Sequence, residues 1–212
     1  ITTAVLLALS LPPFAPWWLI VLGSMIAIIL GKHIYGGLGQ NPFNPAMLAY
    51  AMLLVARPIE MSNWASANMH PQLSIGQVIL YKFNFLSTNL VDAYTMATPL
   101  DLFKHPSLAQ LNNLSVATLS YNLLAWQSLA IAYLAGGVWM LYKKIISWHI
   151  PLAVLASLAI LAASFHTINP AVYAGLSLHL LAGSAIFCAF FIATDPVSAP
   201  VTNKGRLIFG VL

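Results

Sequence analysis

Apolar residues are gathered along the chain in runs separated by short polar or Pro- and Gly-containing breaks. A helix needs about 20 apolar residues to cross a bilayer. We expect four membrane-spanning helices, over Trp17–Tyr35, Leu123–Tyr142, Ile150–Phe165 and Leu178–Thr194. Shorter helices are expected over Ala4–Leu11, before the Pro12-Pro13 pair, over Pro45–Ala56, and from Gly205 onward. The pattern predicts an all-α integral membrane protein, a polytopic helical bundle with broken or half helices.

Composition excludes the main classes of soluble protein. Eight Lys or Arg and four Asp or Glu residues make only 6% of the chain, against about 25% charged residues in soluble domains. Hydrophobic residues make 60%, more than one soluble core of this size can bury. The scattered basic residues form no nucleic-acid patch, so no nucleic-acid partner is expected. The lone Cys188 cannot hold an iron–sulfur cluster, which takes four ligands.

Basic residues in the short loops predict how the chain threads the membrane. A single threading places five of them on one side: Lys32, Lys143, Lys144, Lys204 and Arg206. The positive-inside rule makes that side cytoplasmic.

This orientation gives a predicted organisation in three parts. Residues 1–56 are expected to be membrane helices, residues 57–122 an extracytoplasmic segment, and residues 123–212 membrane helices again. Apolar runs reach both ends of the sequence, so we expect it to be a fragment of a longer chain. The outer part holds most of the polar residues, which makes it a candidate for function.

Two places beside the predicted helices could carry chemistry. In the loop Gly36–Ala46, Asn44 can cap a helix whose first residue is Pro45. The N–H groups of such a helix end attract an anion or a carbonyl oxygen, although a simple helix start explains the same residues. Asp195, an acid beside a span, is either functional or the cap of a short helix starting at Pro196. The residues alone leave these two interpretations of Asp195 equal.

A third place lies in the outer segment, at Thr98. Read physically, Thr98 caps a helix, Pro99 takes its first position, and Asp101 meets the positive helix end. The same geometry would suit a phosphate esterified to the threonine hydroxyl. From the residues alone the capping interpretation is favoured.

Ordered blocks along nearly the whole chain resemble the D subunit of the Rnf (Rsx) electron-transport complex, which is related to the B subunit of the sodium-translocating NADH:quinone reductase. The blocks are residues 11–18, LPPFAPWW; 35–47, YGGLGQNPFNPAM; 97–101, ATPLD; 134–139, LAGGVW; 148–152, WHIPL; 190–197, FFIATDPV; and 203–210, NKGRLIFG. The resemblance implies a longer chain of about ten spans, each of roughly 20 residues.

The resemblance also implies a cofactor and its site. In this family FMN is attached through its phosphate to the last threonine of a motif like Asp-x-x-Ser/Thr-x-Ala-Thr. Here the motif reads Asp92, Thr95, Ala97 and Thr98, so the covalent FMN is expected on Thr98. Met96 departs from the pattern, because related motifs often have Gly there. A second, non-covalent flavin such as riboflavin, or an ion path, is expected near the broken helices around Gly36–Ala46 and Thr194–Pro196.

The implied function is electron relay within a membrane complex. The flavin would carry electrons on the periplasmic side, coupled by the complex to Na⁺ or H⁺ transport between NADH and ferredoxin. The implied partners are the A, B, C, E and G subunits of the complex, a flavin transferase for maturation, and the lipid bilayer. The implied location is the bacterial cell inner membrane, which the chain crosses several times.

Two other functions remain open. The Asn-Pro-Ala triplets at 44–46 and 169–171 resemble those of aquaporins, which suggests a channel or small-solute transporter without flavin. Val172 stands where aquaporins have a pore-guarding Arg. A structural subunit in which Thr98 only caps a helix is the other alternative. Among the histidines, His179 is the one expected to face the bundle.

Overall fold

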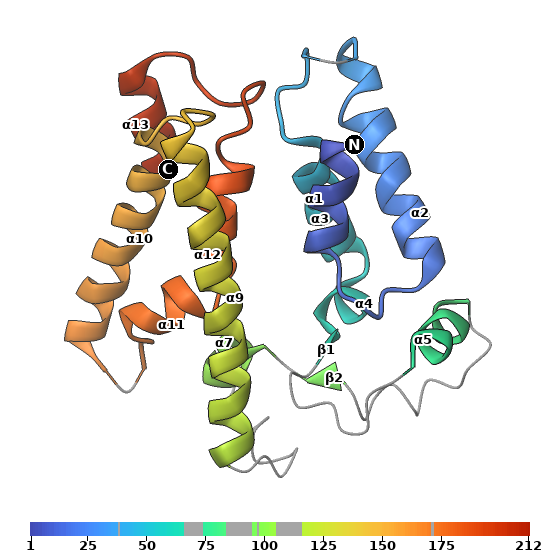
Figure 1. The fold of residues 1–212 in the computed structure, drawn as a ribbon, viewed down its shortest axis with the longest axis horizontal. Coiled ribbons are helices and arrows are strands. Elements are labelled where there is room, and N and C mark those ends of the chain that lie inside the picture. The colour runs from blue at the N-terminus through green and yellow to red at the C-terminus, as the bar shows by residue number, and fades with distance from the viewer. Residues whose placement is uncertain (38, 66–73, 84–94, 97, 105–115, 171) are drawn as a thin grey trace. The chain divides into compact units, whose positions relative to one another are not determined.

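The computed structural model describes residues 1–37, 39–65, 74–83, 95–96, 98–104, 116–170 and 172–212 (Figure 1). The chain divides into two compact units, Ile1–Thr98 and Pro99–Leu212. The boundary between the units falls at the predicted attachment site. Each unit is described on its own.

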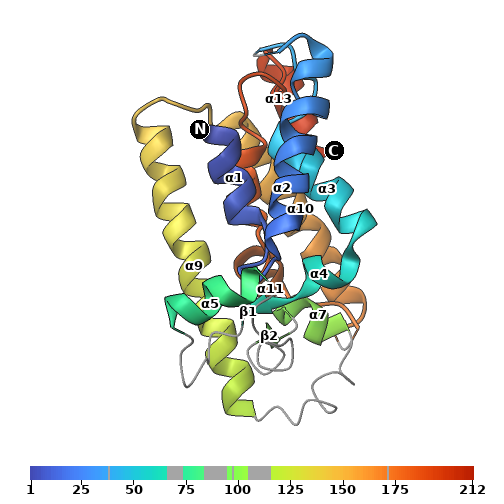
Figure 2. The same ribbon diagram turned by 90° about the vertical axis from the view of Figure 1, so that its right-hand side faces the viewer.

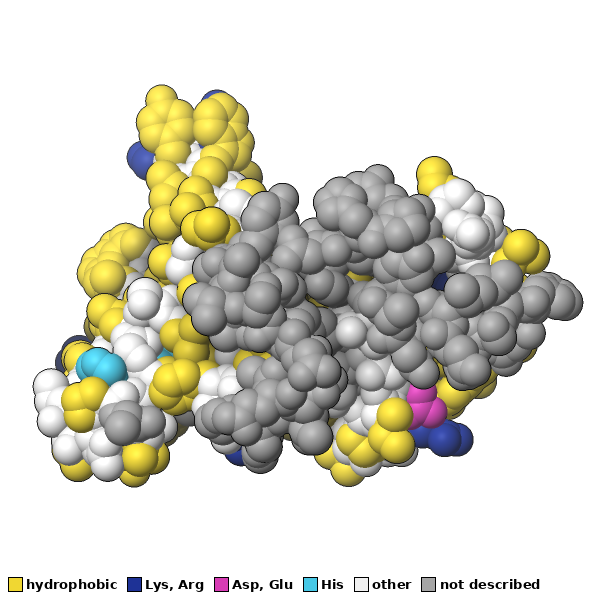
Figure 3. Space-filling model, turned by 90° about the horizontal axis from the view of Figure 1, so that it is seen from below, with side chains coloured by type: hydrophobic (Ala, Val, Ile, Leu, Met, Phe, Trp, Pro, Cys, Tyr) yellow, Lys and Arg dark blue, Asp and Glu magenta, His cyan; other side chains and the backbone are white. Residues whose placement is uncertain are grey.

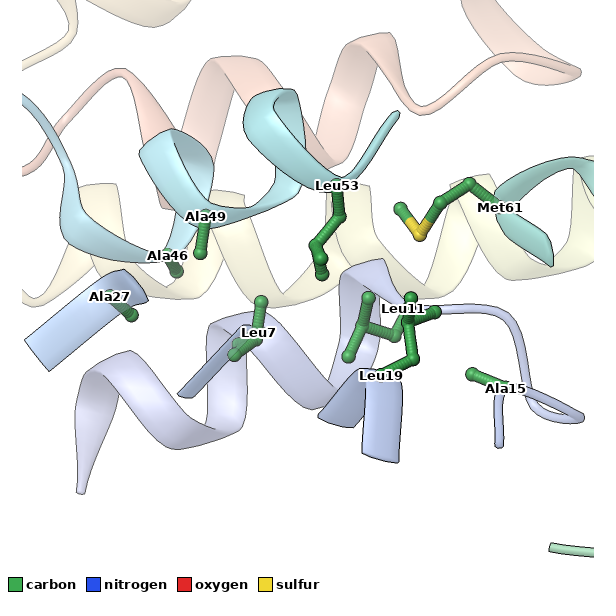
Figure 4. Packing of buried hydrophobic residues seen from close by; sticks show 9 residues of the cluster. All are labelled: Leu7, Leu11, Ala15, Leu19, Ala27, Ala46, Ala49, Leu53 and Met61. Atoms are coloured by element: carbon green, nitrogen blue, oxygen red, sulfur yellow. The ribbon is translucent and has the colours of Figure 1, made fainter. Parts of the chain in front are cut away.

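The first unit is a cluster of short helices around a buried apolar core. Its elements are α1 (Thr2–Ser10), α2 (Trp17–Met25), the π-helix η1 (Ile26–Leu30), the 3-10 helix η2 (His33–Tyr35), α3 (Pro45–Ala56), α4 (Pro58–Ser62), β1 (Trp64–Ala65), α5 (Ile75–Lys82) and β2 (Thr95–Met96). The core gathers side chains from α1, α2, η1, α3, α4 and the connection between α1 and α2 (Figure 4): Leu7, Leu11, Ala15, Leu19, Ala27, Ala46, Ala49, Leu53 and Met61. Leu19 and Leu53 are fully buried, so α2 and α3 pack closely through this cluster.

The two strands form one short antiparallel ladder. Trp64 pairs with Met96 and Ala65 pairs with Thr95. This is the only extended pairing in the part of the chain that the structure describes. It ties the segment before Thr98 back to the end of α4.

The second unit is built on two long helices. Its elements are α7 (Pro99–Lys104), α9 (Val116–Tyr142), α10 (His149–Ile168), α11 (Leu176–Leu181), α12 (Ala185–Phe187), the π-helix η3 (Cys188–Ile192) and α13 (Asn203–Val211). The helices α10 and α13 lie side by side (Figures 1 and 2), and Gly210 permits this because a Cβ there would lie 2.7 Å from Cβ of Ala153. A second core joins α9 to the α12–η3 segment through Ala130, Ile186, Ala189 and Phe190.

The all-α membrane class is confirmed. The described residues contain three helices long and apolar enough to cross a membrane: Trp17–Tyr35, Leu123–Tyr142 and His149–Ile168. They match three of the four predicted spans, and α3 has the predicted bounds. Hydrophobic side chains predominate among the described residues in Figure 3, and charged ones are few.

The fourth predicted span, Leu178–Thr194, is wrong as one continuous helix. The chain leaves the helix after Leu181 and re-enters it at Ala185. Gly183 sits in this break, where a Cβ would lie 3.0 Å from Cδ1 of Leu100 and 3.3 Å from the carbonyl oxygen of His179. Glycine disfavours helix continuation, and a Cβ at this position would require its neighbours to shift by a few tenths of an ångström. Hydropathy alone does not show such a break.

Candidate functional site

The predicted attachment residue lies where a strand gives way to a helix. Thr98 immediately precedes Pro99, the first residue of α7, which confirms the predicted helix start. Thr95 lies in β2, opposite Ala65. The side chains of Thr95 and Thr98 are both partly exposed. Thr98 is therefore held between two ordered elements and is accessible at the surface.

Two members of the predicted motif lie outside the described residues. These are Asp92 and Ala97, so of the four the structure describes only Thr95 and Thr98. Asp101 falls within α7, in its first turn, as predicted. The assignment of residues 57–122 to the extracytoplasmic side stays a prediction.

The glycine-containing loop is tightly folded onto itself. Gly36, Gly37 and Gly39 have φ values of 98°, 99° and 85°, a left-handed conformation that glycine adopts without strain. The buried amide of Asn41 donates from Nδ2 to the carbonyl oxygen of Phe43 at 2.9 Å. The loop is thus a defined backbone structure, positioned by its own glycines and by Asn41.

Asn44 caps α3 as predicted. Its Oδ1 accepts from the N–H groups of Ala46 at 3.0 Å and Met47 at 3.4 Å, and Pro45 takes the first helical position. Upstream, a Cβ on Gly31 would lie 2.5 Å from the carbonyl oxygen of Ala27 and 2.8 Å from Cβ of Pro45. The end of η1 therefore touches the start of α3, and the two broken helices meet at the loop.

Asp195 caps a single turn, whereas the sequence allowed for a short helix from Pro196. The Ser198 hydroxyl donates to Oδ2 of Asp195 at 3.0 Å, and the N–H of Ala199 donates to the Asp195 carbonyl oxygen at 3.0 Å. The chain then runs on to α13 without a helix at 196–202, because Pro200 interrupts it. Just before, the Thr194 hydroxyl donates to the carbonyl oxygen of Phe190 at 2.6 Å.

His179 faces inward, as predicted. It lines a cavity of about 190 Å³ together with residues of α10 and the following loop: Leu158, Leu161, Ala162, Phe165, Tyr173 and Ala174. His166, on the same side of the unit, bonds through Nδ1 to the Tyr173 carbonyl oxygen at 2.8 Å. No group of three His, Cys, Asp or Glu side chains among the described residues could hold a metal ion.

The two π-helices are features that the hydropathy pattern does not reveal. Both η1 and η3 lie next to the places singled out above, since η1 leads to the glycine loop and η3 leads to Asp195. π-helical turns occur frequently at functional sites. Their signature is a hydrogen-bond pattern, such as the Ala193 N–H donating to the Cys188 carbonyl oxygen, and composition does not encode it.

The two Asn-Pro-Ala triplets occupy different structural positions. Asn44 begins α3, whereas Asn169 follows the last residue of α10, Ile168. An aquaporin-like pore needs both triplets at the starts of half-helices.

Comparison with known proteins agrees with the resemblance along the whole chain. The model of the NQR2, RnfD, RnfE family matches residues 1–212. The D subunit of the ion-translocating oxidoreductase complex of Escherichia coli O6:H1 is 42% identical over 226 aligned positions, which cover 99% of this chain and 64% of the relative. The same-named protein of Shigella boydii serotype 18 is also 42% identical with the same coverage. The chain thus spans 64% of the length of these curated relatives. A full-length family match and this identity establish the assignment: the chain belongs to the NQR2, RnfD, RnfE family.

Proposed function

We propose that the chain acts as a membrane subunit of an ion-translocating oxidoreductase complex of the Rnf type and relays electrons through FMN bound covalently to Thr98. The name and 42% identity of the curated relatives support the role in the complex. The position of Thr98, partly exposed between β2 and α7, carries the proposal for the site.

The residues around Thr98 suit a phosphoester. Attachment would join Oγ1 of Thr98 to the flavin phosphorus with loss of the hydroxyl proton, while the phosphoanhydride bond of an activated flavin donor, such as a flavin dinucleotide, breaks and its nucleoside monophosphate leaves. Pro99 fixes its own φ and has no N–H, so it starts α7 at a defined residue and limits the motion of the threonine before it. The pairing of β2 with β1 restrains the chain on the other side. A residue held from both sides yet accessible can be reached by a transferase and then keeps its group in place.

FMN, when bound, accepts and donates electrons one or two at a time. The chain supplies the anchor and thus a high local concentration of the flavin near its partners. We infer that the partners are the A, B, C, E and G subunits, and that a flavin transferase matures the site. The complex would couple electron transfer between NADH and ferredoxin to Na⁺ or H⁺ transport in the bacterial inner membrane, with Thr98 on the periplasmic side.

The loop between η1 and α3 is the proposed place for a non-covalent flavin such as riboflavin, or for part of an ion path. The glycines leave its backbone uncovered by side chains, and Asn41 and Asn44 fix its shape. The turn at Asp195 is the corresponding place in the second unit. Substitution of Asn41 that leaves both the non-covalent flavin content and ion transport unchanged would rule out this role for the loop.

The covalent site is tested on the full-length subunit expressed with its transferase. In-gel flavin fluorescence after denaturing electrophoresis should be present in the wild type and in Thr98→Ser, and absent in Thr98→Ala. Thr202→Ala is a control for loss of a helix cap, because Thr202 is the N-cap of α13 and accepts from the Gly205 N–H at 3.1 Å. Fluorescence that persists in Thr98→Ala would disprove the site, and loss in Thr202→Ala would show that only helix capping is being measured.

A further inference from the structure

One face of α9 bears a shallow, widely open apolar groove near its C-terminal end. Its lining residues recur at helical spacing and come from this helix alone: Ile131, Leu134, Ala135, Val138, Trp139 and Tyr142. Trp139 is 59% exposed and Tyr142 is 75% exposed, so large aromatic surfaces are uncovered along it.

The groove has the length of one bilayer leaflet. From Ile131 to Tyr142 the helix rises about 16 Å, at roughly 1.5 Å per residue. Half of the hydrocarbon core of a bilayer measures about 15 Å. The candidate span in α9, Leu123–Tyr142, ends at the same residue as the groove. The groove therefore extends from near the membrane centre to its surface.

Two lysines stand at the surface end of the groove. Nζ of Lys143 lies 5.0 Å from the ring centroid of Trp139 and 5.8 Å from that of Tyr142, which places the ammonium group over two of the lining residues. Lys144 follows and is exposed. Neither lysine forms an ion pair with any described residue, and the sequence has no Asp or Glu between Asp101 and Asp195. The two adjacent lysines therefore add positive charge at this end of the groove, which no ion pair among the described residues neutralises.

The backbone at Lys144 is costly for a lysine. Its φ is 56°, in the left-handed region. The Lys144 N–H donates to the Leu141 carbonyl oxygen at 2.9 Å and the Ile145 N–H to the Met140 carbonyl oxygen at 3.0 Å. These two bonds form a Schellman motif, whose left-handed position glycine usually fills. The backbone conformation at residue 144 favours glycine, but the lysine found there adds a cation to the end of the groove.

We propose that this face of α9 binds an anionic phospholipid, with an acyl chain in the groove and the headgroup phosphate at Lys143 and Lys144. The apolar lining matches the chain, the groove length matches a leaflet, and the paired cations match the phosphate. A zwitterionic lipid presents the same chain but no net negative charge, so the site distinguishes lipids by headgroup. Trp139 and Tyr142 lie between the acyl-chain groove and the headgroup site, at the level of the membrane interface, where amphipathic aromatic side chains are favoured.

Native mass spectrometry of the full-length subunit tests the proposal. Nanodiscs with equal amounts of phosphatidylglycerol and phosphatidylcholine supply both lipids. The wild type should retain phosphatidylglycerol preferentially, and Lys143→Gln with Lys144→Gln should weaken its retention roughly thirtyfold, at about fivefold for each lysine near the surface. The double replacement of both lysines by Arg keeps the charge and should keep the lipid.

A charge-matched control removes two other basic residues, Lys32→Gln with Lys204→Gln, and should leave lipid retention unchanged. Equal retention of the two lipids by the wild type, or equal loss in both double variants, would overturn the proposal. In the assembled complex, a photoactivatable phosphatidylglycerol should cross-link to residues 131–142. If the cross-link does not form, another subunit covers this face, and the lipid proposal is overturned.

Discussion

The ring of Phe190 in η3 lies directly against the backbone of Gly137 in α9. A Cβ on Gly137 would lie 2.5 Å from Cδ1 and 2.9 Å from Cβ of Phe190, closer than atoms pack. The contact is to the base of the phenylalanine side chain, which cannot move aside without moving η3. The approach of α9 to the π-helix therefore depends on a glycine at this one position.

We expect Gly137→Ala to destabilise the protein by about 1–3 kcal/mol, the usual cost of overpacking a core. The measurement is the midpoint of thermal unfolding of the full-length subunit in detergent. Gly136→Ala is the matched control, because its Cβ would meet only the tip of the Phe191 ring, at 3.3 Å from Cζ, and that ring can shift. Equal midpoints for the two variants would contradict the close approach.

Loss of the Asn44 cap should weaken the start of α3. Asn44→Ala removes the acceptor for the N–H groups of Ala46 and Met47 and should cost about 1 kcal/mol. Asn44→Asp keeps an acceptor oxygen and should retain most of that stability. The midpoints of thermal unfolding of the two variants test this expectation. Equal midpoints for Asn44→Ala and Asn44→Asp would show that the cap does not stabilise α3.

The left-handed conformation of Lys144 should be measurable as a difference between two substitutions. Lys144→Gly and Lys144→Ala both remove the charge, but only glycine fits φ = 56° without cost. We expect the glycine variant to be more stable than the alanine variant by about 1 kcal/mol. Chemical denaturation of both proteins gives this difference in the free energy of unfolding directly. Equal stability of the alanine and glycine variants would show that residue 144 does not adopt the left-handed conformation.

The ion pair at the end of α3 should contribute little. Nη1 of Arg57 lies 3.6 Å from Oε1 of Glu60, with the two side chains 54% and 28% exposed. We expect Glu60→Gln to change stability by less than about 0.5 kcal/mol, as for most surface pairs. Arg57→Ala should cost more, because the guanidinium also lies 5.1 Å from the Trp18 ring centroid and packs over it. If Glu60→Gln is less stable than Arg57→Ala, the predicted order of the two stability losses is wrong.

The sequence predicts best where local chemistry determines the element. Asn44 and Pro45 set the start of α3, and the long apolar run of α10 is visible in composition. The sequence predicts poorly where tertiary packing determines where a helix begins or ends. The break at Gly183 is an example, because Gly183 lies against Leu100 of α7 and hydropathy does not encode that contact. At the candidate site, the sequence correctly places Pro99 at a helix start, because proline is favoured at that position.

The π-helix η3 has a consequence for how this region tolerates change. A π-turn is equivalent to one residue inserted into an α-helix. Everything after Ile192 is therefore rotated by about 100° from where an unbroken helix would carry it. Thr194 and Asp195 owe their directions to that inserted residue as much as to their own identity. Deleting one residue such as Ala189 would close the turn into an ordinary helix and reorient both side chains, an effect that no single substitution reproduces.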